Sequence, residues 1–191
     1  LNDLNYIDLE TKNKDDERKL LNQDVRCTII TSFKSQDVLY DIFYRLNTGS
    51  VPLSSQELRQ VLNKGDFADY LIDITSTTQN LHNIMGLDEP DSRLRDIEII
   101  LRFISFKLFG KTYKGNLSYF LDESMHEINS KWEKYHHEII DIYTKLCKTN
   151  DLLINIFGVE QVGRKFSQGK WERKFNKVLY EVEVFYFMKL L

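Results

Sequence analysis

The chain has 191 residues, of which 42% are hydrophobic, 29% charged and 13% aromatic, a composition typical of a globular protein. Its eight glycines and two prolines exclude collagen-like and low-complexity chains and disfavour a β-sandwich with many turns. The 26 basic and 29 acidic residues give a net charge of −3, so any contact with nucleic acid has to be local. We therefore expect a mainly α-helical protein.

The first 34 residues are expected to be the end of a β portion. Residues 1–23 are polar and charged, and predict loop with a short helix, whereas residues 24–33 alternate in the manner of a strand. One strand is not stable alone, so its partners would lie upstream of Leu1. The chain also ends in an apolar run at Leu191 without a stop signal. We therefore expect a piece of a longer protein.

Residues 35–191 predict a multi-helix subdomain. Apolar residues recur with helical spacing over 36–47, and Ser54 and Glu57 form a capping box for a helix that stops near Gly65. Asp66 is a predicted N-cap for the next helix. Further helices are predicted over 78–85, 92–109, 117–129 (capped by Asn116), 130–149, 151–157 and from about Trp171 to the end.

The two cysteines, Cys27 and Cys147, are far apart and belong to no CxxC motif. This pattern excludes a disulfide scaffold and a thiolate zinc site, and fits a reducing cytoplasm. No apolar run reaches the ~20 residues of a membrane span, and no signal peptide is visible. We therefore expect a cytoplasmic protein that does not enter the membrane.

No pattern for catalysis or for metal binding stands out in the sequence. Glu133 and His136 have the spacing of one half of a di-iron site, but the second half is absent. Glu10 and Lys12 loosely resemble a nuclease motif in a polar segment that predicts no buried strand. We therefore assign no catalytic and no metal-binding residue.

A basic segment extends from Gly163 to Val178, with six cations and a single carboxylate, a local charge of +5. Aromatic residues lie between the cations. Basic groups neutralise phosphates and aromatic rings stack on bases, so the segment is a candidate nucleic-acid contact. The alternative is that the aromatic rings pack inward and the lysines form a solvated face. The candidate contacts are Arg164, Lys165, Lys170, Arg173, Lys174 and Lys177.

The turn after the helix over 36–47 is a candidate anion site. Arg45 and Asn47 end that helix, Thr48 and Gly49 form an exposed turn, and a new helix begins near Ser54. Free N–H groups at a helix N-terminus favour an anion, and arginine can bind a phosphate with two hydrogen bonds. The alternative is a C-cap turn in which Arg45 forms a structural ion pair.

Four stretches, in order, resemble one known family. Residues 42–62, IFYRLNTGSVPLSSQELRQVL, are similar to the first motif of the domain of unknown function 262 family, the N-terminal domain of GmrSD-type restriction proteins. Residues 91–106 resemble its central helix, and residues 113–121 resemble the pattern after that helix. Residues 156–183 resemble its end. The chain departs from the family in having Gly49-Ser50 for Gly-Gly, and in lacking the Asp-Gly-Gln-Gln-Arg motif.

The resemblance implies a bacterial anti-phage restriction protein that acts on foreign DNA and hydrolyses an NTP with Mg²⁺. This chain would be the helical part of a ParB/sulfiredoxin-like α+β domain, with a single β-strand remnant. The missing β portion would carry the catalytic motif, and an HNH nuclease domain would lie elsewhere in the same protein. Candidate phosphate contacts would be Arg45, Asn47, Thr48, Gly49 and Arg59.

Two other classes of function remain open on the sequence alone. The 24 aromatic residues allow an exposed apolar patch, which would make the chain a helical interaction module that forms a homo-oligomer. The basic segment would instead make it a local DNA-binding surface. Catalysis is assigned only to the intact protein that the resemblance implies.

Overall fold

The computed structural model describes residues 7, 11, 14–24, 26, 27, 29, 38, 42, 45 and 52–191. The contacts divide the chain into two units, Leu1–Ser35 and Gln36–Leu191.

The first unit contains helix α2 (Lys14–Leu21), the short helix expected within residues 1–23. None of its residues is buried, although acidic residues in its first turn and basic residues in its last turn suit the helix dipole. Asp24, Arg26, Cys27 and Ile29 are exposed and have no regular structure. The rest of the strand expected over 24–33 lies outside the described residues.

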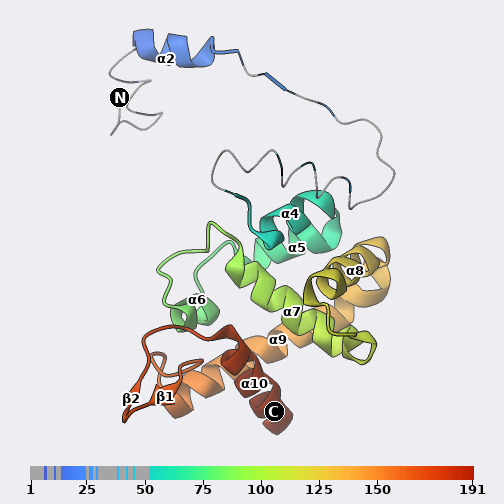
Figure 1. Cartoon of the computed structure of the whole chain (residues 1–191), viewed down its shortest axis with the longest axis vertical. Coiled ribbons are helices and arrows are strands. Elements are labelled where there is room, and N and C mark those ends of the chain that lie inside the picture. Colours follow the sequence, from blue (N-terminus) through green and yellow to red (C-terminus); the bar gives the residue numbers. More distant parts are fainter. Residues whose placement is uncertain are drawn as a thin grey trace. The chain divides into compact units, whose positions relative to one another are not determined.

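The second unit is mainly helical, as the sequence predicts (Figure 1). Val38, Ile42 and Arg45 are helical, and the remainder of the helix expected over 36–47 lies outside the described residues. The helices are α4 (Ser55–Leu62), α5 (Asp66–Thr75), α6 (Asn80–Met85), α7 (Arg95–Phe109), α8 (Leu117–Ser130), α9 (Trp132–Phe157) and α10 (Lys177–Phe187). A small hairpin, β1 (Phe166–Ser167) and β2 (Lys170–Trp171), precedes α10.

Helix α7 crosses the middle of this unit and contacts α4, α5, α8 and α9 (Figure 1). Its predicted core residues Ile97, Ile100, Leu101 and Ile104 are buried, while Leu94 and Leu108 are half-buried. Two residues outside the predicted stripe, Ile99 and Phe103, are buried as well. A helix surrounded by neighbours buries more than one face, which periodicity alone cannot reveal.

The predicted capping box of α4 is confirmed, but the predicted cap of α5 is wrong. Ser54 Oγ accepts the Glu57 N–H at 3.1 Å, and the Glu57 carboxylate accepts the Ser54 N–H. Asp66 lies inside α5, whose first N–H groups donate instead to Asn129 Oδ1 of α8. The adjacent Gly65 (φ +154°) has to be a glycine, since a Cβ there would lie 2.7 Å from that oxygen.

The two helices predicted over 130–149 and 151–157 are one helix, α9. Asn150 looks like a break in the sequence, yet it is buried within the helix and its Oδ1 accepts the Tyr180 hydroxyl at 2.7 Å. The partner on α10 satisfies the polar side chain that would otherwise compete with the helix backbone.

The last helix begins at Lys177, not near Trp171 as predicted. Asn176 is the N-cap of this helix, because its side chain accepts the Leu179 N–H at 3.1 Å. Its own N–H donates to the Gly163 carbonyl at 2.8 Å, which fixes the end of the preceding loop. Trp171 pairs with Phe166 across the hairpin, whose turn residues Gln168 and Gly169 both have positive φ.

Among the helices in the described part of the chain, none is long and apolar enough to cross a membrane.

Candidate nucleic-acid interface

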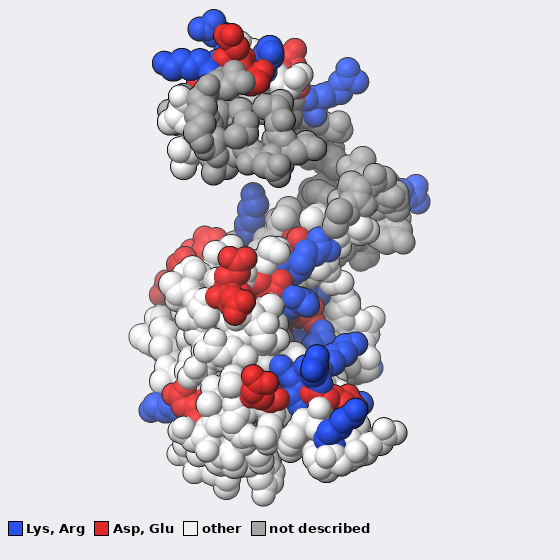
Figure 2. Space-filling view, turned by 90° about the vertical axis from the view of Figure 1, so that its left-hand side faces the viewer, with Lys and Arg blue, Asp and Glu red and all other residues white. Residues whose placement is uncertain are grey.

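Four cations of the basic segment face solvent without an ion pair to any described residue, namely Lys165, Lys170, Arg173 and Lys174. Lys177 is also exposed, but its Nζ lies 2.6 Å from Glu98 Oε1 on α7. These four side chains are therefore available to a phosphate backbone. Figure 2 shows Lys and Arg side chains gathered on the lower half of one face, with a few carboxylates between them.

Arg164 differs from the other cations of the segment because it is buried, with 7% of its surface exposed. Its guanidinium donates to the Arg173, Val162 and Ile84 carbonyls at 3.0, 3.1 and 2.9 Å. Burial lowers its pKa, against the attraction of nearby glutamates. Arg164 therefore ties the segment to the C-terminal end of α6, where a cation suits the helix dipole.

The hairpin presents two aromatic rings to solvent. Phe166 is 60% and Trp171 41% exposed, and their ring centroids lie 5.1 Å apart in a T-shaped pair. Phe175, the third aromatic residue of the segment, packs against the core and lies under Arg164. Two of the three rings thus face outward beside the free cations. The sequence carries a signal for this hairpin that the predicted elements do not include, a Gln-Gly pair between Phe166-Ser167 and Lys170-Trp171.

Gly163, the first residue of the basic segment, packs closely against Phe175 and is hydrogen-bonded to α10. Its N–H donates to Glu183 Oε2 on α10 at 2.8 Å. Gly163 has φ +65°, and a Cβ there would lie 2.8 Å from the Phe175 ring, so no other residue fits without a shift. Burial raises the pKa of the Glu183 carboxyl, although the Gly163 N–H and the charge of Arg164 oppose that shift.

Two cavities lie one after the other along the loop after the hairpin. One, of about 440 Å³, is lined by Trp171 together with two cations, Arg164 and Arg173, and two carboxylates, Glu160 and Glu172. The other, of about 400 Å³, has a different character. Its lining consists of three cations and four apolar side chains: Arg95, Lys174, Lys177, Met85, Leu87, Ile99 and Phe175.

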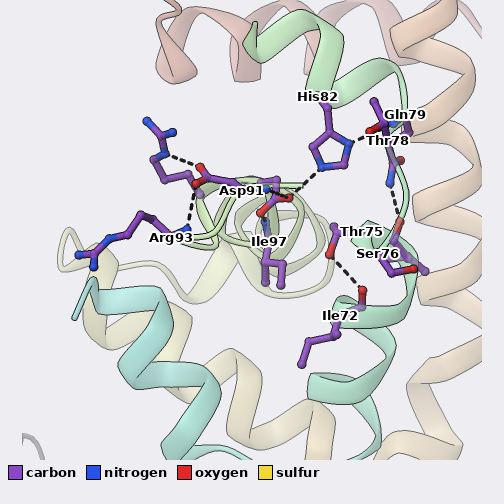
Figure 3. A network of polar contacts seen from close by, with 12 residues as sticks. Ile72, Thr75, Ser76, Thr78, Gln79, His82, Asp91, Arg93 and Ile97 are labelled. Carbon is purple, nitrogen blue, oxygen red and sulfur yellow. Dashed lines mark hydrogen bonds and ion pairs between the residues drawn. The ribbon is translucent and has the colours of Figure 1, made fainter. Parts of the chain in front are cut away.

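A buried network positions the chain segment that forms one side of this second cavity (Figure 3). His82 Nδ1 accepts the Gln79 N–H at 3.0 Å, so Nε2 carries the proton and donates to Asp96 Oδ2 at 2.8 Å. Asp96 also accepts the Asp91 N–H, and Asp91 in turn holds Arg95. Both histidine nitrogens are engaged and the ring is fully buried, so the pair is structural and has no free atom for acid–base catalysis.

Of the five candidate phosphate contacts near the first motif, the structure describes Arg45 and Arg59. Arg45 is helical and exposed, and Asn47, Thr48 and Gly49 lie outside the described residues. Arg59 is buried, with 1% of its surface exposed. Its Nε donates to Asp122 of α8 and its Nη1 to Gln56, each at 2.6 Å, so its guanidinium joins α4 to α8.

The described residues contain no cluster of His, Cys, Asp and Glu that could hold a metal ion. No family model, no curated protein and no solved structure matches the chain.

Proposed function

We propose that this chain binds single-stranded nucleic acid through the hairpin and the four free cations of the basic segment. The observation that supports the proposal is the exposed Phe166–Trp171 pair beside Lys165 and Lys170. An aromatic ring on the surface loses the benefit of burial, whereas a stacked base would cover it again. The flanking cations would neutralise the phosphates on either side.

We further propose that the chain is the helical part of a GmrSD-type restriction protein, on the strength of the sequence resemblance. In that protein residues 24–33 would form a strand that completes a ParB-like β portion, which would bind and hydrolyse an NTP with Mg²⁺. Arg45 and Asn47 would then contact the phosphates, while Arg59 would support the site through α4. The basic segment would contact the DNA strand, and an HNH domain elsewhere in the protein would cut it.

Binding through the hairpin is tested by titrating the whole chain into a fluorescent oligothymidylate of fifteen nucleotides. Base stacking contributes ~1–3 kcal/mol per ring, so Phe166→Ala with Trp171→Ala should weaken binding at least about thirtyfold. Tyr119→Ala is the control, because Tyr119 is about as exposed as Phe166, at 63% against 60%, but lies on α8. Unchanged affinity in the hairpin double variant would overturn the proposal.

A homo-oligomer is the second candidate, and one observation favours it. Val178, Val182 and Tyr186 lie four residues apart on α10 and are 59 to 62% exposed. An apolar stripe of this kind is typical of contact surfaces. Light scattering on the protein samples used for the oligothymidylate titration measures the oligomeric state. A monomer at those concentrations would weigh against the homo-oligomer.

A further inference from the structure

The cavity of about 400 Å³ between α6, α7 and the start of α10 has the size of a small-molecule site. Its walls combine apolar surface with positive charge. Met85, Leu87, Ile99 and Phe175 provide apolar surface, and three cations lie around them. A ligand that fits has a flat or apolar body and an anionic group.

The three cations are not equivalent. Arg95 is held at its Nε by Asp91, and Lys177 is held by Glu98, so each already faces a carboxylate. Lys174 is exposed and has no ion pair with any described residue. An anion in the cavity would therefore be bound mainly by Lys174, with the outer N–H groups of Arg95 as a second donor, since that side chain is 63% exposed.

The neighbouring cavity lacks these properties. Its wall holds two carboxylates, Glu160 and Glu172, beside Arg173 and Arg164, and the Arg164 guanidinium already donates to three carbonyls. Two carboxylates would repel a phosphate at close range. The charged residues lining this cavity balance, whereas the lining of the cavity at Lys174 has three cations and no carboxylate, so the second cavity favours an anion more.

We propose that the cavity beneath Lys174 receives one unpaired nucleotide of the bound strand. Its phosphate would contact Lys174 and Arg95, and its base would lie against Phe175, Met85 and Leu87. The chain passes from the exposed ring of Trp171 to the cavity wall at Lys174 within three residues, so one strand can reach both. The inference rests on the proposed binding of single-stranded nucleic acid and adds where one of its nucleotides is held.

The test uses thymidine 5′-monophosphate, with the whole chain observed by NMR chemical-shift titration. We expect saturable binding that weakens at least fivefold in Lys174→Glu and not in Lys165→Glu, the matched charge reversal on the hairpin. Deoxyribose 5-phosphate carries the same phosphate without a base, and should bind at least fivefold more weakly than the nucleotide. The absence of saturable binding, equal binding by the two charge variants, or equal affinity for the sugar phosphate would each overturn the inference.

The hairpin variants separate this inference from the proposed function. If oligothymidylate binding depends on Phe166 and Trp171 but the mononucleotide does not bind, only the nucleotide pocket is wrong. If the mononucleotide binds through Lys174 but the oligonucleotide is indifferent to the two rings, the hairpin interface is wrong and the pocket remains.

Discussion

Burial decides what a charged residue does within the basic segment. Arg164 and Lys165 are adjacent in sequence, yet Arg164 is buried and donates to three carbonyls whereas Lys165 faces solvent. A buried guanidinium has to be satisfied by acceptors, so it becomes a structural link between loop and helix. The candidate interface therefore contains four freely exposed cations, fewer than the six that the sequence suggests.

Glu183 gives a residue-scale prediction for the pH dependence of stability. Burial raises the pKa of its carboxyl above the ordinary value of 4.5, so the folded state binds this proton more tightly than the unfolded chain. The stability from this group is complete below pH 4.5 and is lost as the pH rises through the folded pKa. Glu183→Gln keeps an acceptor for the Gly163 N–H and cannot ionise. We expect the free energy of unfolding of the variant, relative to the unchanged chain, to rise from pH 4 to pH 7.

Urea unfolding of both proteins at several pH values measures this difference. Glu172→Gln on the exposed hairpin removes one negative charge as well and serves as the control. A difference between Glu183→Gln and the unchanged chain that stays constant or falls over this range would contradict the assigned cause.

At the scale of elements, α8 joins two other helices through polar side chains on its inner face. Asp122 accepts from Arg59 of α4, and Asn129 accepts from the first N–H groups of α5 while its Nδ2 donates to the Asn63 carbonyl at 2.8 Å. A helix end buried without such partners would leave backbone groups unsatisfied. One asparagine thus completes the end of α4 and the start of α5 together.

Asn129→Ala should cost about 2–3 kcal/mol of unfolding free energy, because it removes a helix cap and also leaves a partly buried carbonyl without its donor. Asn116→Ala removes one exposed cap at the start of α8 and should cost only about 1 kcal/mol. Chemical unfolding of both variants provides the comparison. Equal costs would show that the bridge between α4 and α5 contributes nothing beyond an ordinary cap.

At the scale of the whole molecule, a net charge of −3 coexists with a concentrated basic surface. Dissolved salt screens the interaction between exposed charges that lie more than about 8 Å apart at physiological ionic strength. Carboxylates farther away than this would scarcely affect a phosphate at the hairpin. A protein that is acidic overall can therefore bind nucleic acid locally, and its affinity should depend on the few cations at that surface.

If the four free cations contact four phosphates, log K should fall against log salt with a slope of about −3 for a single strand. Oligothymidylate affinity would then drop about 50-fold between 50 and 200 mM salt. Fluorescence anisotropy across that range measures the slope, and Lys170→Glu should make it shallower. A slope near zero would mean that the rings, or another surface, bind the strand without the cations.

Local signals in the sequence determined much of this protein. The scarcity of glycine and proline, the apolar periodicity and the capping residues Ser54 and Asn116 predicted the helical class and several helix boundaries, since each acts within one or two helical turns. The concentration of charge between Gly163 and Val178 located the candidate interface, although not which of its residues are exposed.

Contacts between distant residues decided the rest. Asn129, and not Asp66, caps α5. The Tyr180 hydroxyl donates to the Asn150 side chain, so α9 continues through that residue. The Ile84 carbonyl accepts a hydrogen bond from the buried Arg164 guanidinium. Each partner lies at least 30 residues away, beyond the reach of any local pattern. Satisfaction of buried polar groups is a property of the packed chain, so only the tertiary structure showed which charges and rings of the basic segment stay exposed to solvent.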